Sequence, residues 1–110
     1  MAYYAIVMQT KTARAVLVLD QKVTHSSGRI EELKAWKVPV TDKYPDGIRY
    51  RLVYVDPRSK QVLVLFDNHY PKGHHVHIGD REKGYEYTGT RKLLKDFRQT
   101  VDQLKKKESK

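Results

Sequence analysis

One hairpin decides the fold, and its sequence is IRYRLVYVDPRSKQVLVLF at positions 48–66. The first half alternates as a strand does, with tyrosine and leucine on one side and Arg49 and Arg51 on the other. Residues 56–60, DPRSK, are typical of a turn, and the apolar run 62–66 follows them. The pattern predicts an antiparallel hairpin whose second strand lies in the centre of a sheet.

Other strands are predicted on both sides of this hairpin. Residues 13–19 are β-branched and almost continuously apolar, and residues 85–88 have the composition of a short last strand. The run 29–38 is ambiguous, because its apolar residues recur at helical spacing and also alternate as in a strand. Residues 3–12 fit either a strand extension or one helical turn, so no structure is assigned to them.

A helix is predicted from Thr90, whose hydroxyl can cap it. Its apolar residues form one stripe, which must lie on a face of the sheet to leave water. The stripe consists of Leu93, Leu94, Phe97, Val101 and Leu104. The expected fold is α+β, an antiparallel β-sheet of about five strands in meander order with a C-terminal α-helix packed on one face.

The length of 110 residues predicts a single domain over 1–110, with a basic tail that is frayed from about residue 105. The chain has 22 Lys and Arg against 13 Asp and Glu, a net charge of +9. Subtracting the four lysines of this tail still leaves +5. Such a charge attracts polyanions, so a nucleic acid, a ribosome surface or an acidic protein is the expected partner.

The absence of cysteine excludes disulfides, thiolate metal sites and a cysteine nucleophile, and it fits a cytoplasmic protein. Residues 2–8 are apolar, but the run is short and no basic region precedes it, so it is not a signal peptide. No run approaches the roughly 20 apolar residues of a membrane span. No membrane partner is therefore expected.

Four of the five histidines lie between positions 69 and 77, whereas His25 is predicted to be a lone surface residue. If residues 75–78 are extended, His75 and His77 share one face of the strand while the residues between and after them anchor its other face. Two imidazoles so placed could serve as base and acid in cleaving RNA without a metal. His69 and His74 are additional candidates.

Neighbouring residues suggest how a phosphate would be held. Lys72 and Arg81 could stabilise its negative charge, and Gly73 could let a backbone N–H approach it, unless this glycine only forms a turn. Two alternatives remain open. In the first, His75 and His77 bind zinc or manganese together with His69 or Asp80. In the second, the histidines only lie exposed on a basic surface, and Asp67 and Asn68 close a turn.

The spacing of these polar residues resembles a signature of the TumE family, small toxins of type II toxin–antitoxin operons. That signature reads Asp-Asn, a short spacer, Lys-Gly, any residue, His, a basic residue, His, and later Arg-Glu. The matching positions are Asp67, Asn68, Lys72, Gly73, His75, His77, Arg81 and Glu82. The likeness extends from about residue 15 to 104, and the segment 34–39 is similar to the family's Trp-x-Val-Pro strand end. On that ground the run 29–38 is predicted to be a strand.

The resemblance implies a toxin that acts in the cytoplasm, through RNA, and is neutralised by a DNA-binding antitoxin encoded beside it. One departure is Val76, where the family tends to carry Arg or Lys. If that cation holds a phosphate, either activity is reduced here or Arg81 takes over its role. The leading hypothesis is a metal-independent endoribonuclease without a cofactor. The alternatives are a non-catalytic basic module that binds RNA or a ribosome, and a metal hydrolase with His75, His77 and Asp80 as ligands. A homo-oligomer is left open.

Overall fold

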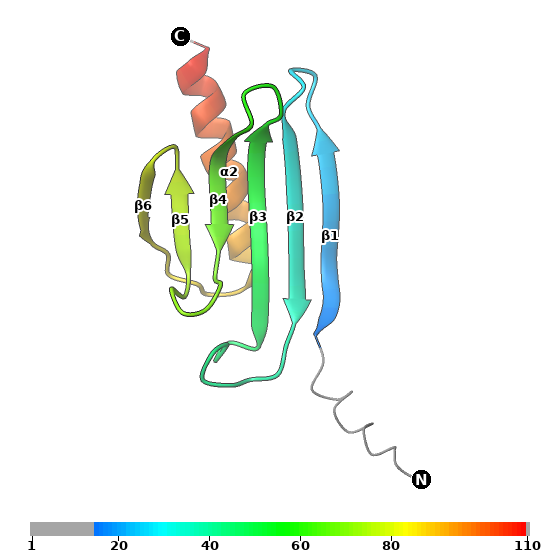
Figure 1. Cartoon of the computed structure of the whole chain (residues 1–110), viewed down its shortest axis with the longest axis vertical. Coiled ribbons are helices and arrows are strands. Elements are labelled where there is room, and N and C mark those ends of the chain that lie inside the picture. Colours follow the sequence, from blue (N-terminus) through cyan, green and yellow to red (C-terminus); the bar gives the residue numbers. More distant parts are fainter. Residues whose placement is uncertain (1–14, 110) are drawn as a thin grey trace.

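The computed structural model describes residues 15–109, which form one antiparallel sheet of six strands in the order β1 to β6 with one helix against it. Figure 1 shows the strands side by side in chain order, with α2 behind β3 and β4. The elements are β1 (Val16–Thr24), β2 (Ile30–Lys37), β3 (Ile48–Asp56), β4 (Gln61–Asp67), β5 (His75–Ile78), β6 (Arg81–Gly84) and α2 (Thr90–Glu108). The predicted α+β meander with a C-terminal helix is confirmed, with six strands rather than about five.

The central hairpin forms as its sequence predicts. Arg51 of β3 pairs with Asp67 of β4, and Leu52 pairs with Phe66. The turn begins at Asp56, whose Oδ1 accepts the backbone N–H of Arg58 at 3.0 Å. Because β3 also pairs along its length with β2, the run 29–38 is confirmed as a strand.

The main core lies between the sheet and one face of α2. Alternate residues of the strands point to this face, and one stripe of the helix packs on them. Phe97 of the helix meets Phe66 of β4 edge to face, with ring centroids 5.6 Å apart. The buried core comprises Leu33, Ala35, Ile48, Tyr50, Leu52, Tyr54, Val64, Phe66, Val76, Leu93, Phe97 and Val101.

The last strand differs from the prediction. Residues 85–88 are irregular, and the strand lies just before them, in β6. Tyr85 and Tyr87 alternate in the sequence because both pack against the core. The ring centroids of Tyr85 and Phe66 are 5.3 Å apart. The strand β6 was missed because all of its residues are exposed and no apolar period marks it.

The ends of other elements also differ from the sequence prediction. Gly89 is the residue before the first helical turn and offers no side-chain cap, whereas Thr90 is already helical, so capping by Thr90 is wrong. The helix continues to Glu108, through the residues for which fraying was predicted, and Glu108 pairs with Arg29 at 3.0 Å. The strand expected at 13–19 begins at Val16 and reaches Thr24, and the segment 3–12 lies outside the described residues.

Candidate functional site

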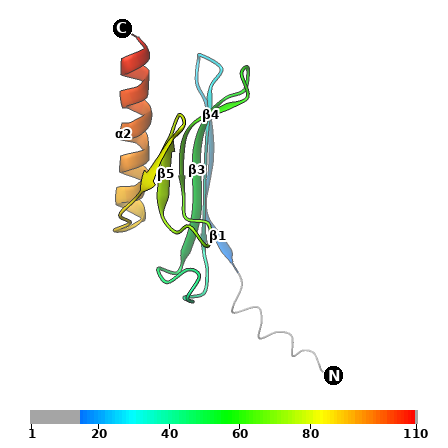
Figure 2. The same ribbon diagram turned by 60° about the vertical axis from the view of Figure 1, so that its left-hand side comes forward.

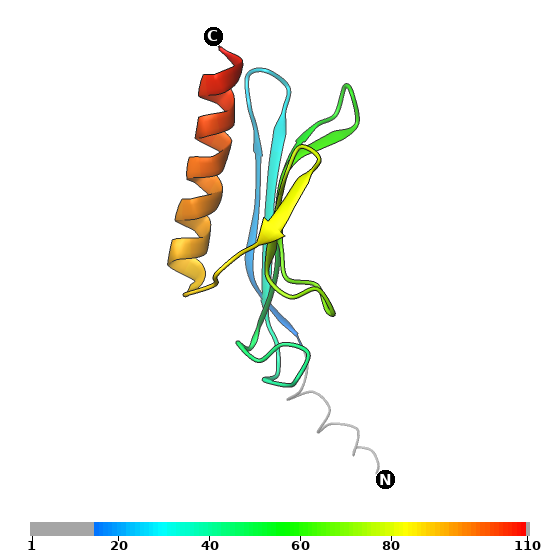
Figure 3. The same cartoon turned by 90° about the vertical axis from the view of Figure 1, so that its left-hand side faces the viewer.

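The sheet has an open face, defined as the face opposite α2. Figures 2 and 3 show the helix on one side of the sheet, and no described element covers the other side. The strand β5 is extended, as the histidine pattern requires. Val76 is 3% exposed and belongs to the core, so His75 and His77 lie on the open face. Their ring centroids are 5.1 Å apart.

His75 is held in a defined orientation. The side chain is buried, and its Nδ1 lies 2.8 Å from the carbonyl oxygen of Gly73. A carbonyl only accepts, so Nδ1 carries the proton and Nε2 of the neutral ring keeps a lone pair. Gly73 has φ +73°, and a Cβ there would meet nothing within 4 Å. This glycine is therefore needed for its left-handed backbone and not for a close approach to a neighbouring group.

Glu82 and Lys72 complete what we call the histidine cluster, made of His75, His77, Glu82 and Lys72. Glu82 pairs with His77 across β5 and β6, and its Oε1 lies 3.7 Å from Nε2 of His77. Nζ of Lys72 donates to both carboxylate oxygens of Glu82, at 2.7 and 2.9 Å. This hydrogen bond lowers the pKa of Glu82, and the nearby imidazoles act in the same direction.

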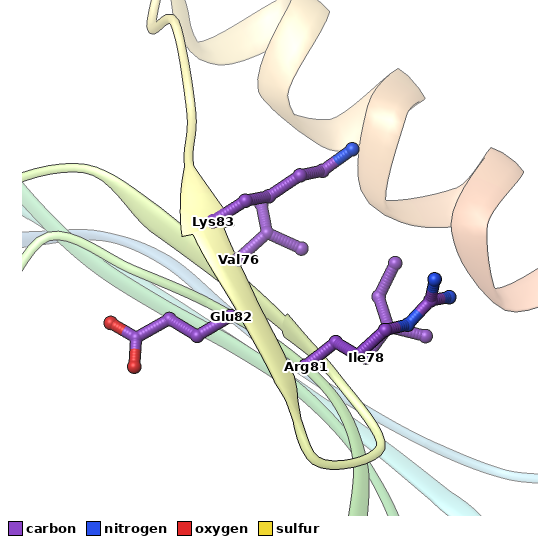
Figure 4. A pocket seen from close by; sticks show the side chains of 5 residues that line it. All are labelled: Val76, Ile78, Arg81, Glu82 and Lys83. Atoms are coloured by element: carbon purple, nitrogen blue, oxygen red, sulfur yellow. The ribbon is translucent and has the colours of Figure 1, made fainter.

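Arg81 does not join this cluster. It pairs with Ile78 and therefore points to the helix side, together with Lys83, while Glu82 points to the opposite side (Figure 4). A pocket of about 200 Å³ runs along this part of β5 and β6. The pairing register therefore places Arg81, the predicted phosphate clamp, on the face of the sheet opposite the histidines.

The departure from the family pattern at Val76 has the same explanation. Its side chain is buried under α2, so an arginine or lysine at this position would also point away from His75 and His77. The open face therefore loses no cation through Val76.

Arg49 and Arg51 of β3 lie on the open face, the same face as His75 and His77. The sequence pattern did not select them as site residues. Register places Lys34, Arg51, Asp67 and His75 opposite one another in a row across β2 to β5. Arg51 and His75 are two strands apart, about 10 Å between backbones. The alternation in β3 was the available signal, because it sets these arginines opposite the core tyrosines.

A groove of about 250 Å³ lies next to this row. The guanidinium of Arg49 stacks 5.4 Å from the ring centre of Trp36, which combines an aromatic surface with positive charge. The groove is lined by Trp36, Arg49, Tyr50, Arg51, Asp67 and His69. His69 thus belongs to the groove, while His75 and His77 are absent from its lining.

Asp67 and Asn68 shape the loop between β4 and β5. Oδ1 of Asp67 accepts the backbone N–H of His69 at 2.6 Å, which closes the turn as predicted. Asn68 is buried and bonds instead to β3: Oδ1 accepts the N–H of Tyr50 at 2.9 Å, and Nδ2 donates to the carbonyl of Ile48 at 2.8 Å. This side chain fastens the loop that leads to the histidines.

Replacing Asn68 by alanine is expected to lower the free energy of unfolding by about 2 to 3 kcal/mol, because it leaves a buried N–H and a buried carbonyl without partners. Urea denaturation would measure this. His69→Ala is the matched control, since its exposed side chain is expected to contribute less than about 0.5 kcal/mol. Equal stability of the two variants would contradict a fastening role for Asn68.

The remaining candidates have structural surroundings. His74 lies 2.9 Å from the hydroxyl of Tyr50 and 2.8 Å from a carboxylate oxygen of Asp46, and its ring stacks on Tyr87. Burial raises the pKa of Tyr50. His25 is not a lone surface residue, because its Nε2 lies 2.6 Å from Glu31.

A metal could be held by a different set from the predicted one. Ligand atoms of His75, His77 and Glu82 all lie within 4.8 Å of one another, and this group, found within the described residues, does not include Asp80 or His69. Asp80 is exposed in the turn that joins β5 to β6. The pairing of β6 with β5 thus brings Glu82, rather than Asp80, to the imidazoles.

Comparison with known proteins gives one family. The family model described as Toxin TumE matches residues 5–105. Neither the curated proteins nor the solved structures gave a match. Within residues 15–109, no helix combines the length and the apolar composition needed to cross a membrane. A toxin of this kind implies an antitoxin partner, and the chain belongs to the TumE toxin family.

Proposed function

We propose that this toxin cleaves RNA as a metal-independent endoribonuclease, with His75 and His77 as general base and general acid. The observation that carries the proposal is the pair of imidazoles on the open face, 5.1 Å apart, of which one has its tautomer fixed by Gly73. Base and acid groups on one side of a strand can act on the two oxygens of a single phosphodiester.

The reaction assigns a role to each group. Nε2 of His75 takes the proton of a ribose 2′-hydroxyl, and the 2′-oxygen attacks phosphorus. The bond to the 5′-oxygen breaks, and this oxygen takes a proton from His77. The products are a 2′,3′-cyclic phosphate and a 5′-hydroxyl. The Glu82 carboxylate, 3.7 Å from His77, can balance the charge of its imidazolium form.

Cations on the open face would hold the phosphates. Arg51 and Lys34 lie in the row that includes His75, and both are exposed. Arginine suits this role because its planar guanidinium donates two parallel hydrogen bonds to a phosphate. The stacked pair of Trp36 and Arg49 offers a surface for an adjacent base.

The test uses purified, untagged protein and single-stranded RNA in excess EDTA. We expect cleavage that leaves 2′,3′-cyclic phosphate ends, and we expect Arg51→Glu to lower its rate about tenfold or more. Lys95→Glu is the control, because it makes the same charge change on the exposed side of α2. No cleavage in EDTA would overturn the proposal.

The alternative function, a non-catalytic basic module that binds RNA or a ribosome, is tested with variants of α2 and of the histidines. If it were correct, charge reversal at Lys92, Lys95 and Arg98 of α2 would abolish RNA or ribosome binding, and alanine at either histidine would leave growth inhibition unchanged. Two further elements of the proposal are that the antitoxin binds DNA and that the toxin acts in the cytoplasm.

A further inference from the structure

We infer that His75, His77 and Glu82 form a binding site for one zinc-class divalent ion, and that Lys72 competes with this ion for Glu82. The ligand atoms of the three residues lie within 4.8 Å of one another. They come from two paired strands, so the backbone register fixes their relative positions.

The surroundings of His75 are those of a metal ligand. Its Nδ1–H donates to a backbone carbonyl, which fixes the ring orientation and leaves Nε2 able to bind an ion. Such a hydrogen bond on the second ring nitrogen is what histidine ligands usually make. Because His75 is only 8% exposed, this orientation is held by packing as well.

Small side-chain rotations would close the site. Bonds of about 2.0 to 2.2 Å to a tetrahedral ion place its ligand atoms about 3.4 Å apart. Nε2 of His77 and Oε1 of Glu82 are already 3.7 Å apart, and these side chains are 29% and 38% exposed, so they have room to move. The open face leaves the fourth position to water, as in three-ligand zinc sites.

Lys72 holds the carboxylate that the ion needs. Its Nζ bonds both oxygens of Glu82, and the ammonium cannot remain there beside a divalent cation. Lys72 is 58% exposed, so it can swing into water when an ion arrives. The Lys72–Glu82 pair and the bound ion are therefore alternative states of one site.

The donor set decides the kind of ion. Two imidazoles and one carboxylate suit zinc, cobalt, nickel or copper, whereas magnesium prefers an octahedral set of oxygen ligands. We therefore expect the chain to bind Zn²⁺ and Co²⁺, with Mg²⁺ at the same concentration binding far more weakly.

An ion here would also act on the reaction, and this part rests on the proposed function. An ion bound through the imidazole nitrogens takes the lone pair that the base needs and the proton site that the acid needs. Zn²⁺ is therefore expected to inhibit the cleavage seen in EDTA, and added chelator is expected to restore it.

The experiment titrates the chelator-treated, untagged full chain with Co²⁺ by absorption spectroscopy and with Zn²⁺ by calorimetry. We expect one ion per chain. His75→Ala, His77→Ala and Glu82→Gln should each weaken binding about tenfold or more. Lys72→Met should tighten it about two- to fivefold, because it removes the competing ion pair. Lys83→Met is the control. Lys83 lies next to Glu82 in β6 but points to the helix side of the sheet (Figure 4).

Each outcome decides one statement. Binding that survives the loss of either histidine, or the absence of any binding, overturns the site, and equal affinities for Lys72→Met and Lys83→Met overturn the competition. One bound ion in a protein that never cleaves RNA would support the site and reject the proposed function. Cleavage in EDTA by a protein that binds no ion would support the proposed function and reject the site. Activation of cleavage by Zn²⁺ would overturn the inhibitory role of the ion.

Discussion

Alanine in place of either His75 or His77 is expected to lower the rate of RNA cleavage by about 10²- to 10⁴-fold, the usual contribution of a general base or acid. Neither loss can be compensated from nearby, because His74 is engaged with Tyr50 and Asp46 and His69 lines the separate groove. Single-turnover cleavage of a labelled RNA would measure the effect. In the unaltered protein the rate should pass through a maximum with pH, since one imidazole must be neutral and the other protonated.

Controls separate chemistry from folding. His75→Asn retains a donor for the carbonyl of Gly73 but lacks the nitrogen in the Nε2 position, so it should fold normally and remain inactive. Gln99→Ala, a change at an exposed residue of α2 on the other side of the sheet, should cleave at the original rate. Full activity in both His75→Ala and His77→Ala would remove the two residues from the mechanism.

The second large effect concerns the contact between helix and sheet. Phe97→Ala is expected to lower the free energy of unfolding by about 3 to 5 kcal/mol. The ring is fully buried, lies in the middle of the helical stripe and meets Phe66 edge to face. Without it a cavity opens between α2 and the centre of the sheet. Denaturation in urea, followed by circular dichroism, would measure the change.

Two comparisons test the cause of that loss. Phe97→Leu fills most of the space and should cost clearly less than Phe97→Ala. Gln99→Ala changes an exposed residue of the same helix and should stay within about 0.5 kcal/mol of the original protein. A loss below about 1 kcal/mol for Phe97→Ala would mean that the helix is not anchored by this ring.

Local patterns predicted the parts of the fold that depend on local chemistry. The hairpin at 48–66 combines a two-residue period with turn-forming residues, and the helix has a long apolar stripe, so each was evident from its own segment. The segment 29–38 was not, because its period fits two structures, and resemblance to a family decided it. The strand at 81–84 carries no apolar residue and could be found only through its pairing with β5.

The candidate site was predicted in part, for the same reason. The shared face of His75 and His77 follows from alternation within one strand. The register between β5 and β6 determines the rest. It brings Glu82 rather than Asp80 beside His77, and it places Arg81 on the helix side of the sheet. The row that contains Arg51 depends on two further registers, β3 with β4 and β4 with β5. Such long-range pairings leave no trace in the sequence around each residue.

Because α2 covers one side of the sheet only, selection for stable folding and selection for binding act on different faces of the sheet. Residues that point toward the helix determine whether the chain folds, whereas exposed residues on the open face can be replaced without a change in the core. Substitutions of exposed residues there, such as Arg49 or Lys34, are expected to cost little stability. Within this family, the two faces of the sheet should therefore diverge at different rates.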